Sequence, residues 1–148
     1  MKKYFVLSIA LVIALMAFTA STPTALASST DLPPGIYATT ISESDVPAEF
    51  PTEVVALLVG YWEIEFTELG SYIVNKDGSP VATGRYNSNP GRINMKDLDG
   101  VLACTDAPGI TSATYRWSLS GDELFLTTVI DRCAGRNAVL TAHPLVKQ

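Results

Sequence analysis

The sequence predicts an all-β protein whose antiparallel strands form an up-and-down, eight-stranded barrel. Short runs of alternating apolar and polar residues recur along the chain, and turn sequences of a few residues separate most of them. These turns are too short for the helical crossovers that parallel strands require. Closure into a barrel removes the strand edges that a series of hairpins would leave exposed. A β-sandwich is the alternative, but the sequence shows no long Greek-key connection.

The N-terminal segment predicts export. Lys2-Lys3 precede an apolar run over residues 4–18, and a stretch of small residues ends in Ala25-Leu26-Ala27. We therefore expect a secretory signal peptide, residues 1–27, that is cleaved after Ala27. An uncleaved membrane anchor is the alternative, although the run is short for about 30 Å of hydrocarbon and no basic cluster follows it.

The mature part, residues 28–148, is long enough for a single domain with its own core. The full chain has a net charge of −5, and removal of a signal segment with two lysines and no acidic residue changes this to −7. Such a charge argues against nucleic acid or an anionic lipid surface as a partner. We expect a secreted or extracytoplasmic monomer that is free of the membrane after signal cleavage, with no cofactor and no metal.

Eight segments have the composition and alternation of strands. The second segment alternates most clearly, with Trp62, Ile64 and Phe66 on one face. Asp77-Gly78 is a strong signal for a tight hairpin between the third and fourth segments. The predicted strands are residues 35–41, 60–67, 71–76, 80–87, 92–98, 113–120, 123–130 and 137–143.

One segment between the first two predicted strands breaks the alternation. In Ser42–Gly60, Thr52 is a candidate N-cap for the apolar run Val54–Val59, and Gly60 is a suitable terminator. We predict a short helix here that covers an opening of the barrel. The valine content leaves an additional buried strand open for Pro51–Val59.

The chain has two cysteines, Cys104 and Cys133. In an oxidising compartment, a lone pair of cysteines predicts one structural disulfide. The closed loop spans 30 residues, from 104 to 133, for which the chain-entropy model gives about 3.6 kcal/mol. Free thiols are the alternative, but the single histidine, His143, lies ten residues beyond Cys133.

Gly60-Tyr61-Trp62 at the head of a strand matches the G-x-W signature of lipocalins and their calycin relatives. Such barrels carry an arginine near the last strand that packs across this tryptophan, and Arg136 precedes the predicted strand 137–143. The chain resembles small secreted bacterial lipocalin-like proteins over roughly residues 35–145. The resemblance implies a ligand-binding barrel, but here the G-x-W lies in the second predicted strand and not in the first.

Alternation places one aromatic face of the strands inside the barrel. An internal cavity of roughly 300 Å³ or more would favour the binding of a small hydrophobic or amphipathic ligand. A core filled by its own side chains would instead favour a structural or interaction protein of the cell envelope. We expect Tyr37 and Arg136, with Tyr86, to close one end of the barrel by a cation–π stack. The predicted ligand contacts are Trp62, Phe66, Tyr72, Tyr115 and Trp117.

We predict no catalytic residue. Glu63 and Glu65 fall on the outer face of their strand, so they do not form a carboxylate pair inside the barrel. Asp97 and Asp99 lack the further ligands of a calcium loop and are interpreted, like Asp131, as turn residues. A small β-barrel cyclase or isomerase would need an ionisable group inside the barrel, and the alternation places none there.

Overall fold

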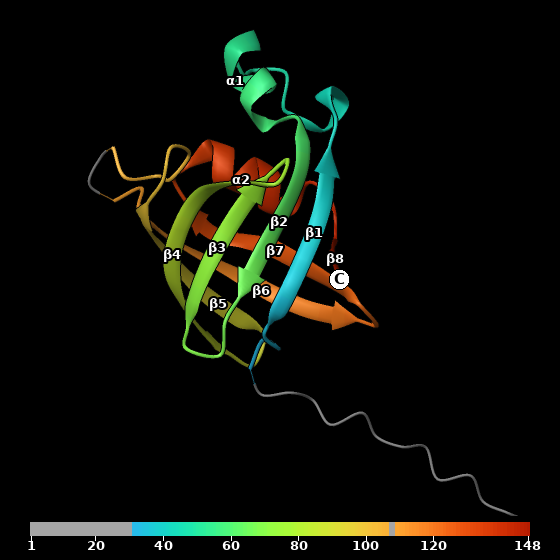
Figure 1. The fold of residues 1–148 in the computed structure, drawn as a ribbon, viewed down its shortest axis with the longest axis vertical. Helices are drawn as coiled ribbons and strands as arrows, with labels where there is room; N and C mark the ends of the chain where they lie inside the picture. Colours follow the sequence, from blue (N-terminus) through green and yellow to red (C-terminus); the bar gives the residue numbers. More distant parts are fainter. Residues whose placement is uncertain (1–30, 107–108) are drawn as a thin grey trace, which may run out of the picture.

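The computed structural model describes residues 31–106 and 109–148 (Figure 1). Within these ranges, eight strands close into one antiparallel barrel, in which consecutive strands pair and β8 pairs with β1. The predicted up-and-down barrel is confirmed, while the predicted signal peptide, residues 1–27, lies outside the described residues. The strands are β1 (Gly35–Ile41), β2 (Gly60–Phe66), β3 (Ser71–Lys76), β4 (Ser79–Asn89), β5 (Arg92–Asp99), β6 (Ser112–Ser120), β7 (Glu123–Asp131) and β8 (Leu145–Lys147).

The hairpin between β3 and β4 has the predicted two-residue turn. Lys76 pairs with Ser79, and the intervening Asp77 and Gly78 have φ angles of 50° and 79°. Positive φ at both central positions is the geometry that matches the twist of the flanking strands, and Asp-Gly adopts it readily. The Asp77 carboxylate also accepts a hydrogen bond of 2.9 Å from the backbone N–H of Tyr61 on β2.

Alternation in β2 separates core from solvent as predicted. Trp62, Ile64 and Phe66 are buried, whereas Tyr61 is exposed. The buried face of β2 therefore runs the length of the barrel, with Trp62 near one end and Phe66 near the other. At the Phe66 end, the ring contacts those of Tyr37 and Tyr86 at centroid distances of 5.9 and 4.9 Å.

The segment before β2 is a helix, so the alternative of a buried strand for Pro51–Val59 is wrong. Helix α1 (Thr52–Leu58) follows a 3₁₀ turn (Glu43–Asp45) and ends one residue before Val59, whose N–H still donates to Val55. Seven residues are too few for a stable isolated helix, so tertiary packing must hold α1 in place. Leu58 is its buried residue, and none of the helices among residues 31–106 and 109–148 is long and apolar enough to cross a membrane.

The strand predicted for residues 137–143 is wrong, because Ala134–Thr141 forms helix α2 and β8 follows it at Leu145–Lys147. Valine, leucine and threonine in this segment favour a strand, but the inward residues are spaced as on a helix. Gly135, Arg136, Val139 and Leu140 all face one cavity, at intervals of three and four residues. The threonine hydroxyl of Thr141 donates to the carbonyl of Asn137, one turn earlier.

Both α1 and α2 lie at the same end of the barrel, called here the helical end (Figure 1). A core cluster at this end joins the two helices to the strands. His143, just after α2, lies 3.0 Å from Asp45 of the 3₁₀ turn, which ties this segment to the β1–α1 connection. The buried members of the cluster are Ile41, Val46, Leu58, Trp62, Val81 and Val139.

Candidate functional site

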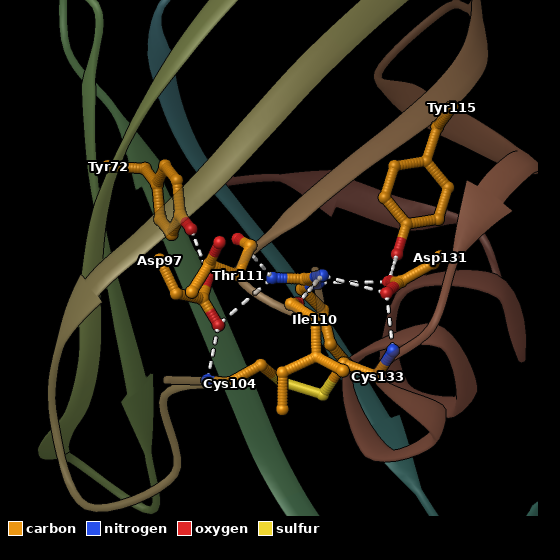
Figure 2. Close-up of a disulfide and its surroundings, with 9 residues drawn as sticks. Tyr72, Asp97, Cys104, Ile110, Thr111, Tyr115, Asp131 and Cys133 are labelled. Carbon is orange, nitrogen blue, oxygen red and sulfur yellow. Dashed lines mark hydrogen bonds and ion pairs between the residues drawn. A yellow bond between two sulfur atoms is a disulfide. The ribbon is translucent and has the colours of Figure 1, made fainter. Parts of the chain in front are cut away.

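Arg136 of α2 is the centre of a buried polar cluster. Figure 2 labels the aspartates, tyrosines and cysteines of this cluster. Its side chain is 8% exposed and forms ion pairs with Asp97 of β5 at 3.0 Å and with Asp131 of β7 at 2.7 Å. Its Nε also donates to Asp131, and its terminal nitrogens donate to the carbonyls of Ile110 and Thr111. The guanidinium therefore makes four hydrogen bonds within the protein, and its Nη1 also forms the ion pair with Asp97.

Asp97 and Asp131 have the same kinds of partners on opposite sides of the guanidinium. Asp97 accepts hydrogen bonds from the Tyr72 hydroxyl and, at 2.7 Å, from the backbone N–H of Cys104. Asp131 accepts hydrogen bonds from the Tyr115 hydroxyl and, at 2.8 Å, from the backbone N–H of Cys133. Each aspartate therefore connects Arg136 to one tyrosine and to one half of the disulfide (Figure 2).

The pKa values of Tyr72, Tyr115 and Arg136 are all raised above their ordinary values. Burial raises the pKa of the Tyr72 and Tyr115 hydroxyls, and their hydrogen bonds to the aspartates raise it further. Burial alone would lower the pKa of Arg136, but the hydrogen bonds that it donates to Asp131 and the charges of both aspartates outweigh burial and raise that pKa. The tyrosines therefore remain neutral donors and Arg136 remains a cation at ordinary pH.

Two aspartates interpreted as turn residues are thus buried inside the barrel, and those interpretations are wrong. Asp97 lies two residues after Met95 and four after Ile93, so alternation from these two buried residues places it on the inward face of β5. The expectation that alternation places no ionisable group inside the barrel is therefore wrong. The inward position of Asp131 depends in addition on a β-bulge. The register of β6 and β7 shifts between Tyr115↔Thr128 and Thr114↔Ile130, so a bulge reverses the alternation before Asp131.

Gly84 on β4 provides the space that Tyr72 needs to reach Asp97. A Cβ atom at this position would lie 2.3 Å from both Cζ and Oη of Tyr72, and 2.4 Å from the carbonyl oxygen of Lys96. These distances are well below van der Waals contact, so a side chain at position 84 would displace the tyrosine ring or the backbone of β5. The glycine thus belongs to the architecture of the polar cluster.

A cavity of about 190 Å³ lies at the helical end, between the helices and the barrel wall. Arg136, Asp97 and Tyr72 of the polar cluster form one part of its lining, and apolar side chains form most of the rest. The cavity is smaller than the 300 Å³ expected for a ligand-binding barrel, yet the interior is not filled. The apolar lining includes Val54, Leu57 and Leu58 of α1, Val139 and Leu140 of α2, and Trp62, Ile64, Val74, Val81, Ala82 and Met95 of the strands.

The structure divides the predicted ligand contacts between two regions. Trp62 and Tyr72 line the cavity. Phe66 and Tyr115 belong to the buried cluster that fills the remainder of the barrel. Trp117 is only partly buried at the edge of that cluster, and its indole N–H donates to the carbonyl of Asn89 at 3.0 Å.

Tyr37 and Arg136, expected to close one end together, have different partners. Tyr37 is fully buried near Phe66, and the cation over its ring is Lys147 of β8, with Nζ 6.0 Å from the ring centroid. Arg136 and Trp62 line the same cavity, but the guanidinium is engaged by Asp97 and Asp131. The arginine thus anchors α2 to β5 and β7.

Cys104 and Cys133 form the predicted disulfide, with their Cα atoms 6.1 Å apart. It connects the β5–β6 loop to the start of α2, and Cys133 lines the cavity. Comparison of the chain with protein-family models, with curated proteins and with solved structures gives no match.

Proposed function

We propose that the protein is an exported, lipocalin-like barrel that binds one small, mainly apolar molecule in the cavity at the helical end. The observation that carries the proposal is the cavity of about 190 Å³ with its largely apolar lining. Engineered apolar cavities of about 150 Å³ stay dry and take up benzene. A cavity of this size therefore suits a single ring with a short substituent better than a long acyl chain.

The position of α1 supports an entry route for the ligand. The helix forms part of the cavity wall through Val54, Leu57 and Leu58. It has seven residues, and Leu57 is about half exposed. Because so short a helix depends on its packing, opening of α1 costs less than opening of the barrel.

The two tryptophans allow a direct test of binding. We would titrate ¹⁵N-labelled protein with toluene and record both indole N–H signals by NMR. The Trp62 signal should shift, because this indole lines the cavity and donates to the Leu58 carbonyl at 2.8 Å. The Trp117 signal should not, because that residue lies outside the cavity lining.

A pair of neighbouring substitutions separates cavity binding from surface binding. Ala82→Leu extends a side chain that lines the cavity, whereas Thr83→Leu adds an apolar side chain at an exposed position of the same strand. Ala82→Leu should abolish the toluene-dependent shift of Trp62, and Thr83→Leu should preserve it. Absence of a toluene effect in the unmodified protein would contradict the proposal and favour a structural or interaction role.

The mass of the protein in the secreted fraction of its producing organism tests export. We expect a chain that begins at Ser28 and is two hydrogens lighter than the reduced form, because Cys104 and Cys133 are bonded. A retained N-terminal segment would contradict signal cleavage. A co-purifying small molecule in the native spectrum would identify a ligand.

A further inference from the structure

We infer that the cavity selects small ligands that carry a hydrogen-bond donor or a positive charge, and that it rejects carboxylates. This inference rests on the proposed binding function and specifies its ligand class. The polar side chains of the lining are Arg136, Asp97 and Tyr72, together with the indole of Trp62. Their effect on a ligand depends on which of their donors and acceptors the protein already uses.

The side-chain donors of the lining are engaged within the protein. Arg136 directs its N–H groups to Asp97, Asp131 and two backbone carbonyls. The Trp62 indole donates to the Leu58 carbonyl at 2.8 Å, and the Tyr72 hydroxyl donates to Asp97. A ligand carboxylate would therefore meet no free side-chain donor among these residues, although a cation forms part of the wall.

Acceptor capacity, in contrast, remains at Asp97. Its Oδ2 accepts from the Cys104 N–H and lies 3.0 Å from Nη1 of Arg136. Its Oδ1 accepts from the Tyr72 hydroxyl. A carboxylate oxygen has two acceptor positions, and a tyrosine oxygen that donates its proton can still accept one. Within the described residues, the polar part of the lining thus offers acceptors at Asp97 Oδ1 and at the Tyr72 oxygen.

The net charge of the cluster also disfavours the binding of a carboxylate. Asp97 and Asp131 carry two negative charges against the single positive charge of Arg136, which leaves an excess of one negative charge beside the cavity. These aspartates are 4% and 0% exposed, so water screens them weakly. A buried anionic ligand would be repelled and would lose its hydration without compensating hydrogen bonds.

Four single-ring probes test this preference: toluene, benzyl alcohol, the benzylammonium ion and benzoate. Each is titrated into the full mature protein at pH 7 and constant ionic strength, with the Trp62 indole signal as the readout. We expect benzyl alcohol and benzylammonium to bind about tenfold more tightly than toluene, as one added hydrogen bond to a charged acceptor implies. Benzoate should bind more weakly than toluene.

The outcomes distinguish failure of the inferred ligand selectivity from failure of the proposed cavity binding. If toluene binds as tightly as benzyl alcohol, or if benzoate binds as tightly as either, the inferred selectivity is overturned while cavity binding stands. If none of the four probes shifts the Trp62 signal, both the selectivity and the proposed function are overturned.

The two tyrosines provide a matched pair of variants. Tyr72→Phe removes a hydrogen bond to Asp97 at the cavity, and Tyr115→Phe removes the equivalent bond to Asp131 outside the lining. Tyr72→Phe should raise the affinity ratio of benzylammonium to toluene by about fivefold, because Asp97 Oδ1 then has a further open acceptor position. Tyr115→Phe should leave the ratio within about twofold. Equal changes in both variants would contradict a local role of Asp97.

Discussion

Substitution of Arg136 by methionine should destabilise the protein severely. The change preserves much of the apolar stem but removes the cation between Asp97 and Asp131, whose side chains are 4% and 0% exposed. Loss of one member of a buried ion-pair network typically costs about 3–5 kcal/mol, because the remaining charge is buried without a partner. For a domain with about 5–15 kcal/mol of stability, this loss brings the unfolding transition close to native conditions.

Arg136→Lys tests whether the geometry of the guanidinium matters beyond its charge. An ammonium group has three donors, whereas the guanidinium makes four hydrogen bonds in a fixed planar geometry, so at least one hydrogen bond of the cluster is lost. With buried acceptors left unsatisfied, we expect a cost of about 2–4 kcal/mol. This variant also retains a folded state that can be measured if the methionine variant does not fold.

The assay is urea unfolding followed by tryptophan fluorescence at pH 7, with Arg132→Met as the control. Arg132 is exposed and lies four residues before Arg136, outside α2, so its substitution should change the unfolding free energy by less than about 0.5 kcal/mol. A cost below about 1 kcal/mol for Arg136→Met would refute the argument that the cluster depends on its cation. Full stability of Arg136→Lys would refute the role assigned to the planar group.

Three further changes test other parts of the structure. Replacing both cysteines of the disulfide by alanine should lower the unfolding free energy by about 3.6 kcal/mol, since the 30-residue loop is no longer closed in the unfolded chain. Gly84→Ala should cost about 1–3 kcal/mol, because the added Cβ lies 2.3 Å from the Tyr72 ring. Hydrogen bonds from the side chain and backbone of Ser42 lower the pKa of Asp45 to about 2, so its stabilising contribution should be present above about pH 4 and lost as pH falls to about 2.

Urea unfolding measures the first two changes, and a series of melting temperatures measures the third. An unfolding free energy for the alanine pair equal to that of the unmodified protein would contradict the loop-entropy argument. No change in stability on Gly84→Ala would show that Tyr72 can move without loss. For Asp45, the melting temperature of Asp45→Asn should lie below that of the unmodified protein at pH 5 and approach it at pH 2; a constant difference would contradict the assigned pKa.

The sequence predicts the barrel because hairpin strands carry local signals. Asp77-Gly78 determines a tight turn by its own backbone preferences, and the alternation of Trp62, Ile64 and Phe66 determines which face of β2 is buried. Neither feature depends on residues far away in the chain. The same holds for α1, where an apolar run between turn signals forms the predicted helix.

The buried polar cluster is harder to predict from local sequence signals, because its residues come from β3, β5, β6, β7 and α2. Alternation from Met95 places Asp97 inside, but its charge favours a turn until Arg136 is known to be its partner. Asp131 depends on a bulge whose position is set by pairing with β6. Arg136 faces inward only because its segment is helical, and valine and leucine in that segment equally suit a strand.

The hydrogen bonds of the cysteine backbones have a consequence for how the protein is oxidised. The N–H groups of Cys104 and Cys133 donate to Asp97 and Asp131, and Arg136 holds these two aspartates together. The Cα separation of 6.1 Å is therefore maintained by contacts that exist without the sulfur–sulfur bond. The folded, reduced chain would present both thiols to an oxidant at a high effective concentration. Formation of the disulfide then requires an electron acceptor, but no conformational search to bring the two cysteines together.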